Sequence, residues 1–198
     1  MKTQLLKYVS LLSLYFVLFL SNAFAQNYYV SALTGSDSNT GLSTTTAFAT
    51  IQKGADMVSA GGTVFIMNGR YNRTTYGSVL ELTKSGNAGG YITFKAYQGH
   101  TPKISASGSS WNAIIINGSY VILDGLELEG NNANLTLAGA VKAFDDNVAG
   151  TAPPNAAYNT NGISIGSGAN PHHVTIRNCK VHDFPGGGIG GGGCDYIT

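Results

Sequence analysis

Residues 161–184, NGISIGSGANPHHVTIRNCKVHDF, contain three short runs in which apolar and polar residues alternate. The runs are Ile163–Ile165, Val174–Arg177 and Cys179–His182, and turn-forming residues separate them. Alternation with a period of two, with β-branched residues on the inner side, predicts strands rather than a helix. The stretch therefore predicts three short strands joined by tight turns.

The same pattern recurs along the chain. Equivalent runs begin at Thr63, Tyr91, Tyr120, Val174 and Tyr196. Successive starting positions therefore lie 28, 29, 54 and 22 residues apart, and 54 is about two periods. A repeat of this length indicates a solenoid, in which each unit buries its apolar face only by stacking on its neighbours. Three strands and three turns per repeat predict an all-β fold, a right-handed parallel β-helix. An antiparallel sandwich would also give short strands and glycine-rich turns, but sandwiches do not repeat at this period.

One turn of the repeat has its own signature. Asn178 stands between the second and third strands, and asparagine tolerates the left-handed conformation and hydrogen-bonds to backbone in tight corners. We expect Asp124 to hold the equivalent place one recognisable coil earlier.

The first 25 residues predict a secretory signal peptide. Lys2 and Lys7 give a positive start, residues 11–20 an apolar stretch, and residues 23–25 an Ala-Phe-Ala cleavage site. An uncleaved membrane anchor is the alternative, but the apolar stretch is short for a spanning helix. We therefore expect a protein that is secreted or displayed at the cell surface.

Charge and cysteine content restrict the partners. Without the two lysines of the signal, nine basic residues stand against ten acidic ones, and no Lys/Arg cluster is present, which argues against nucleic acid. Cys179 and Cys194 do not share a position in the repeat, so we favour free thiols over a disulfide, and their spacing is not that of a metal site. We expect the complete protein to be a monomer.

Residues 26–62 predict a strand, a loop and one helix. Phe48, Ile51, Ala55 and Val58 follow a helical period, Thr50 can cap the start, and the two glycines at 61–62 are expected to end it. A helix placed before the first coil can cover the open end of a β-helix core, which is otherwise an exposed strand edge.

Residues 63–198 predict the coils. The rhythm fails at about residues 131–160, where we expect an excursion from one corner, and such insertions often form a binding surface. Residues 195–198 match the second strand of the preceding coil, after which the sequence stops without a polar cap. We expect the 198 residues to be the front part of a longer, C-terminally truncated β-helix.

These features resemble a known family. The N-terminal cap and first coil are similar to those of secreted β-helix proteins of the pectin-lyase-like superfamily, in particular the family 9 and family 6 (chondroitinase-B-like) polysaccharide lyases. The match covers nearly all of residues 27–198, and it is carried by YYVS at 28–31, GSDSNTG at 35–41, FATIQK at 48–53, GGTV at 61–64, GRY at 69–71, KSG at 84–86, ITFKAY at 92–97 and VILDG at 121–125.

The resemblance implies β-elimination of a uronate-containing, acidic polysaccharide. Calcium would neutralise the uronate carboxylate, and a Lys or Arg base would remove the adjacent proton. In such enzymes these groups lie in central coils, so the catalytic residues are expected beyond residue 198. Whether these 198 residues alone form an active enzyme stays open.

Candidate binding residues can still be named. Arg177, Lys180 and His182 all point outward in one coil and could contact a uronate, although ordinary surface charge is the favoured explanation. Adjacent carboxylates at Asp145 and Asp146 in the excursion are the local calcium candidates, against a simple solvated acidic loop.

Other clusters favour plainer interpretations. Glu127 and Glu129 alternate with leucines and point outward about 7 Å apart, as an acidic patch or as a solvated strand face. Asp37, Asn39 and Gly41 have the spacing of a calcium-loop start, but an Asx turn is favoured because no closing carboxylate follows.

Two other functions remain open. A glycoside hydrolase on the same scaffold would need a pair or trio of carboxylates on one face. A non-enzymatic carbohydrate-binding or adhesive surface protein would need none.

Overall fold

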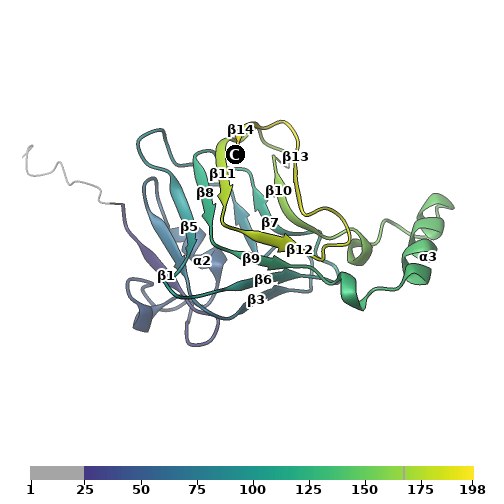
Figure 1. Cartoon of the computed structure of the whole chain (residues 1–198), viewed down its shortest axis with the longest axis horizontal. Coiled ribbons are helices and arrows are strands. Elements are labelled where there is room, and N and C mark those ends of the chain that lie inside the picture. The colour runs from purple at the N-terminus through teal and green to yellow at the C-terminus, as the bar shows by residue number, and fades with distance from the viewer. Residues whose placement is uncertain (1–24, 167) are drawn as a thin grey trace, which may run out of the picture.

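The computed structural model describes residues 25–198 except residue 167, so the predicted signal peptide lies almost entirely outside the described residues. The chain winds into a parallel β-helix with three sheets (Figure 1). The first sheet has the order β1-β2-β5-β8-β11-β14, the second β13-β10-β7-β4 and the third β12-β9-β6-β3. Every strand pair in these sheets is parallel. The predicted solenoid is confirmed.

The strand bounds show the coils in sequence. They are β1 Tyr28–Val30, β2 Thr63–Ile66, β3 Arg70–Arg73, β4 Leu80–Leu82, β5 Ile92–Ala96, β6 Lys103–Ala106, β7 Asn112–Ile116, β8 Val121–Asp124, β9 Glu127–Glu129, β10 Asn161–Ile165, β11 His172–Arg177, β12 Lys180–His182, β13 Ile189–Gly191 and β14 Asp195–Ile197. The five runs that recur in the sequence lie in β2, β5, β8, β11 and β14, which are successive strands of one sheet.

The core is built from ladders of like residues at equivalent positions. In the second sheet, Leu80, Ile114 and Ile163 stack in register, and all three are fully buried. Tyr71, Ile104 and Leu128 do the same in the third sheet. Because one face of every strand is inward, the period-two pattern becomes a continuous apolar column, and its burial supplies the main stabilisation of the solenoid.

The register differs from the expected alignment at more than one place. Val174 pairs with Val121 and Ile197 rather than with Tyr120 and Tyr196. The corner residue is shifted by one position as well. Asp124 pairs with Arg177, so the position equivalent to Asn178 is Gly125 and not Asp124. Both turn residues adopt the left-handed conformation, with φ of 54° at Asn178 and 73° at Gly125. The geometry of the corner therefore repeats, while glycine and asparagine alternate as the residues that can adopt it.

The predicted helix is α2, Ile51–Met57, and it packs against β1, β2 and β4 at one end of the core. Thr50 caps it as expected, since its side-chain oxygen accepts from the Lys53 amide at 3.1 Å. It ends at Met57 rather than at the glycines, because Val58 turns to an extended conformation and buries its side chain in the core.

Asp37 also has a role that the sequence did not reveal. Its Oδ1 accepts from the amides of Ala49 and Thr50 at 2.9 Å each, and its Oδ2 accepts from the Thr50 hydroxyl at 2.8 Å. The Asx turn expected here is wrong: the carboxylate holds the start of α2 instead.

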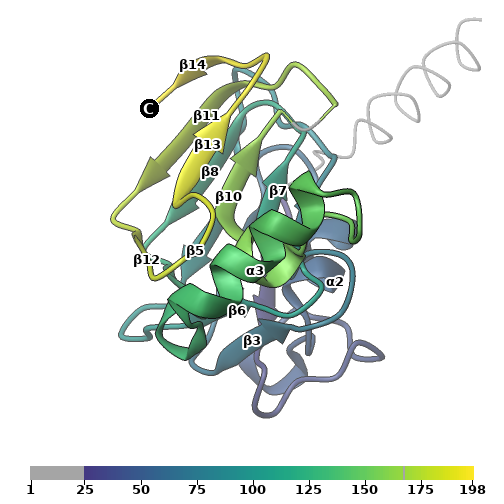
Figure 2. The same ribbon diagram turned by 90° about the vertical axis from the view of Figure 1, so that its right-hand side faces the viewer.

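Between β9 and β10 the chain leaves the coil. This excursion contains the 3-10 turns η2 (Asn132–Asn134) and η3 (Ala156–Tyr158) and the helix α3 (Leu137–Val148), which projects from one corner of the solenoid (Figures 1 and 2). Across residues 25–198 apart from residue 167, no helix has the length and apolar character needed to cross a bilayer.

Candidate functional site

The outer face of the third sheet carries a row of charged side chains, which we call the charged face. In register across β3, β6, β9 and β12 stand Arg70, Lys103, Glu127 and Lys180. Two residues further along β9 and β12, on the same face, Glu129 lies beside His182. Parallel stacking brings these side chains, distant in sequence, within contact of their neighbours on adjacent coils.

Two carboxylates organise this face. Glu127 Oε1 lies 3.2 Å from Lys103 Nζ, 3.6 Å from Lys180 Nζ and 3.1 Å from His182 Nε2. Glu129 Oε2 lies 2.6 Å from Arg70 Nη2 and 3.9 Å from Lys103 Nζ. Lys103 thus bridges the two acids, and the network joins all four strands of the sheet.

His182 lies between two acids. Its Nδ1 is 2.7 Å from Asp183 Oδ2, and its Nε2 faces Glu127. Only the imidazolium form can donate from both nitrogens, whereas the neutral ring donates to one acid alone. The ring is held in a fixed orientation in either form.

A second cluster lies at the corner between the first and third sheets. Lys95, Asp124 and Arg177 stack in register on β5, β8 and β11. Asp124 Oδ2 is 3.1 Å from Arg177 Nη2 and 3.4 Å from Lys95 Nζ. Its other oxygen, Oδ1, accepts from Asn178 Nδ2 at 2.8 Å.

In the pairs that Lys and Arg form with Glu127, Glu129 and Asp124, the acids lie deeper than the bases, whereas Asp183 beside His182 is 56% exposed. The side chains of Arg70, Lys103 and Lys180 are 52%, 41% and 69% exposed, against 20% for Glu127 and 28% for Glu129. The difference is larger at the corner, where Arg177 is 54% exposed and Asp124 only 6%. Although the formal charges nearly balance, the groups that face solvent are predominantly cationic.

The pKa values of the three acids follow from these contacts. Partial burial alone would raise the pKa of Glu127, but the hydrogen bonds from His182 and Lys103 and the charges of both lysines lower it overall. Burial opposes the fall at Asp124 in the same way, and its bonds from Asn178 and Arg177 outweigh it, so its pKa is lowered. The hydrogen bond from Arg70 is the main cause of the lowered pKa of Glu129. All three are therefore ionised at neutral pH.

The three sequence-predicted binding residues are only partly brought together. Lys180 and His182 meet at Glu127, whereas Arg177 belongs to the Asp124 cluster at the corner. Sequence reasoning missed Arg70, Lys103 and Lys95. They could have been found by extending the repeat back by two coils. That alignment places Arg70 and Lys103 in register with Glu127, and Lys95 in register with Asp124.

The calcium candidates occupy a different setting from the expected loop. Asp145 and Asp146 lie on helix α3, where neighbouring side chains point about 100° apart, and Asp146 pairs with Lys142 at 2.7 Å. In the part of the chain that the structure describes, no group of three or more His, Cys, Asp or Glu side chains could hold a metal ion. The acids of the charged face and Asp146 already have cationic partners, so these carboxylates do not form a site that fits a calcium ion.

The two cysteines are free thiols, as favoured from the sequence. Burial raises the pKa of Cys179, more than its hydrogen bonds to backbone lower it. A thiol of this kind is a weak nucleophile, and it packs against the core.

Comparison with known proteins agrees with the fold. A family model described as "Pel9A-like, right handed beta helix region" matches residues 28–191. No curated protein gives a significant match by sequence.

Solved structures give the same answer. A rhamnogalacturonan lyase superposes with a TM-score of 0.53 at 20% identity, over 85% of this chain and 51% of that one. A GH136 lacto-N-biosidase from Eubacterium ramulus superposes with a TM-score of 0.58 at 18% identity, over 86% of this chain and 30% of that one. At these identities the likeness concerns the fold, and the chain spans about half of the lyase and about a third of the biosidase.

Proposed function

Because the chain belongs to the Pel9A-like right-handed β-helix family, we propose that it is an exported carbohydrate-active protein, lyase-like in type, that binds uronate-containing polysaccharide on the charged face. The observation that carries this proposal is the depth difference on that face. Exposed Arg70, Lys103 and Lys180 stand above more buried acids, so a polyanion meets cations first.

The acids under these cations serve to position them. A lone exposed lysine samples many rotamers, and ordering it on a ligand costs up to about 2 kcal/mol of side-chain entropy. Contact with Glu127 and Glu129 holds Lys103 in one place before any ligand arrives. A guanidinium such as that of Arg70 can also bind a carboxylate through two parallel hydrogen bonds.

The spacing of the cations suits a polymer. Strands of one sheet lie about 4.8 Å apart, so cations on β3, β6 and β12 form a row across the coils. A polysaccharide with repeated carboxylates can contact several of them at once, which raises the affinity of the chain above that of a single sugar.

Lyase chemistry is the further part of this proposal. In β-elimination a base takes the proton α to the uronate carboxylate, the electron pair forms a C=C bond, and the glycosidic C–O bond breaks. The leaving oxygen then takes a proton. Cations that bind the carboxylate favour the first step by stabilising the charge that develops there.

The glycoside hydrolase alternative finds less support. Its general acid needs a raised pKa, whereas the contacts described above lower the pKa of both Glu127 and Glu129. This pair therefore does not supply the acid that hydrolysis requires.

The test compares binding of polygalacturonate and alginate with binding of a neutral galactan. Lys103→Ala and Lys180→Ala should each weaken binding of the acidic polymers at least about fivefold, since a charge-assisted contact contributes roughly 1 kcal/mol or more. Lys142→Ala is the matched control, because it removes the same charge from the exposed helix α3.

The outcomes separate the possibilities. Equal losses in Lys103→Ala and Lys142→Ala would mean that only total charge matters and would refute the charged face as the binding site. Release of unsaturated product, followed by absorbance with calcium and with a chelator, tests the lyase part separately from binding.

A further inference from the structure

A hollow lined by loop residues lies beyond the ends of β3 and β6, and we call this hollow the Trp111 groove. It has a volume of about 400 Å³ and is formed by three loops that follow β3, β6 and helix α3 in successive coils. Tyr76, Trp111, Ser109 and Asn155 supply its aromatic and polar side chains, and glycine, alanine and proline residues form the rest of the lining. None of these carries a charge.

Two aromatic side chains form the walls. Tyr76 is 79% exposed and Trp111, the one tryptophan of the sequence, is 36% exposed. Large aromatic rings are normally buried for the area they remove from water, and Trp and Tyr left at a surface are typical of binding sites. Ser109 and Asn155 add a hydroxyl and an amide between them.

Buried hydrogen bonds fix the three loops to one another. Ser110 Oγ donates to the Gly77 carbonyl at 2.7 Å. The Thr160 hydroxyl contacts the Ser110 and Ala156 carbonyls at 2.9 and 2.8 Å. Ser110 and Thr160 are 0% and 1% exposed, so these bonds are shielded from water.

Arg73 holds the remaining wall. Its Nε donates to the Tyr76 carbonyl at 3.1 Å, which fixes the loop that carries the ring. The walls are thus positioned without a ligand, and little ordering cost remains for binding.

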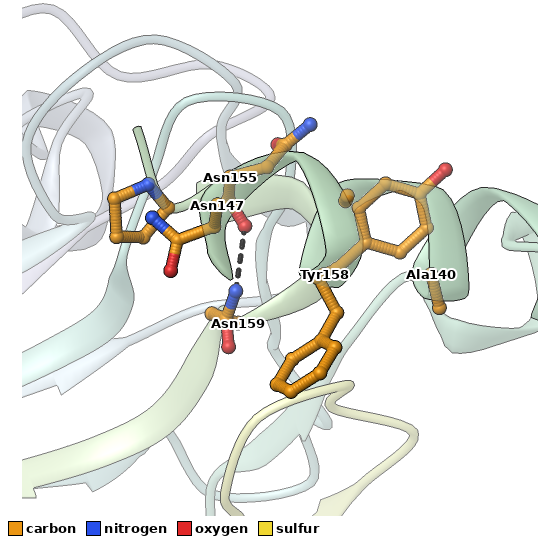
Figure 3. A pocket seen from close by; sticks show the side chains of 8 residues that line it. Ala140, Asn147, Asn155, Tyr158 and Asn159 are labelled. Carbon is orange, nitrogen blue, oxygen red and sulfur yellow. Dashed lines mark hydrogen bonds between the residues drawn. The ribbon is translucent and has the colours of Figure 1, made fainter. Parts of the chain in front are cut away.

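A neighbouring hollow of about 260 Å³ shares two lining residues, Pro154 and Asn155, with the groove. Figure 3 shows Tyr158, Asn147 and Asn159 around it. The Asn159 amide donates to the Asn155 carbonyl at 2.9 Å, which fixes the position of Asn155 in the wall that both hollows share. Aromatic rings and uncharged amides therefore line both hollows.

This chemistry matches a neutral sugar. A pyranose has an apolar face of C–H groups, which can lie on an aromatic ring, and a rim of hydroxyls that pair with amides and hydroxyls. No lining side chain is cationic, and the guanidinium of Arg73 is already engaged by the Tyr76 carbonyl. A uronate carboxylate would therefore lose water here without a free cationic partner, which is costly. We propose that the Trp111 groove binds neutral sugar units of a glycan chain, separately from the charged face.

Trp111 supplies the test, because it is the one tryptophan of the sequence and the tryptophan fluorescence therefore reports on the groove. The protein is titrated with cellotetraose, mannotetraose and galactotetraose, and with tetragalacturonate for comparison. At least one neutral tetrasaccharide should change the emission saturably, and tetragalacturonate should act more weakly. Tyr76→Ala keeps the reporter and should weaken the response about tenfold, which corresponds to 1.4 kcal/mol.

Two variants serve as controls. Tyr196→Ala removes an equally exposed tyrosine, 74% exposed, at the far end of the coils and should leave the titration unchanged. Lys103→Ala should also leave it unchanged while weakening polygalacturonate binding, so that failure of one proposal is distinguishable from failure of the other.

Three results would overturn the groove proposal. They are no saturable change with any neutral tetrasaccharide, an unaltered response in Tyr76→Ala, and a stronger response to tetragalacturonate than to every neutral ligand. Far-ultraviolet circular dichroism of Tyr76→Ala shows whether the fold is retained.

Discussion

Asn178 donates from Nδ2 to Oδ1 of Asp124 at 2.8 Å, although 54 residues separate the two. The asparagine occupies a left-handed turn with φ of 54°, and its amide reaches back to the preceding coil. One residue thus makes the corner possible and ties two coils together.

Replacing Asn178 separates these two roles. Asn178→Gly keeps the turn and loses only the hydrogen bond, whereas Asn178→Ala loses the bond and adds strain in the left-handed region. We expect the alanine variant to be less stable than the glycine variant by about 1 kcal/mol. Urea unfolding of both variants measures the difference, and equal stabilities would show that the turn carries no strain.

Acid should weaken the charged face. The folded-state pKa of Glu127 lies below its unfolded value, so its stabilisation is complete above that unfolded value, about 4.3. It is lost as the pH falls further through the lowered folded value, because the unfolded state then binds more protons. The free energy of unfolding of the wild type should therefore decrease once the pH is lower than about 4.3.

Glu127→Gln is the matching variant, since it cannot ionise. Its stability at pH 7 should be lower than that of the wild type, and the gap between the two should narrow in acid. Added salt should narrow the gap as well, by screening the lysines. A stability difference between the two proteins that stays constant from pH 7 to pH 3 would mean that the charge of Glu127 does not contribute to stability.

The sequence repeat was sufficient to predict the coils and their inward and outward faces. Alternation along each strand has a period of two in every coil, so it needs no long-range information. It was not sufficient to fix the register at the corner, because Asp124 and Gly125 are both turn-forming residues and either could align with Asn178.

Helix α3 could have been predicted from the sequence. Leu137, Val141, Phe144 and Val148 follow steps of four, three and four residues, which is a helical period, but the prolines and glycine after them favoured a loop. The part that Asp37 plays was not predictable, since it depends on contacts with residues 12 and 13 positions away.

The charged face shows the same limit. Lys180 and His182 were found because they lie in the best-defined repeat, whereas Arg70 and Lys103 lie in earlier coils whose alignment was not extended to the third strand. Which cation meets which acid depends on coil stacking, and a pattern within one strand does not contain that information.

Burial predicts a sharp contrast between two apolar residues. Ile114 is fully buried in the middle of its ladder, and Leu137 on α3 is 82% exposed. Ile114→Ala should cost about 2–5 kcal/mol, since it removes buried methyl groups and leaves a cavity. Leu137→Ala should change the stability by less than about 0.5 kcal/mol. A large loss in Leu137→Ala, measured by urea unfolding, would show that the helix packs on something in solution.

Coil stacking predicts the effect of a single methyl group at two glycines. A β-carbon at Gly118 would overlap the Lys84 carbonyl of the preceding coil, whereas a β-carbon at Gly190 would meet no atom within 4 Å. Neither residue has a positive φ, so the two substitutions differ in space and not in backbone strain. Gly118→Ala should lose about 1–3 kcal/mol through forced separation of the coils, while Gly190→Ala should be neutral or slightly stabilising. Thermal unfolding of both variants checks this contrast, and a stable Gly118→Ala would mean that the corner can open to admit the methyl group.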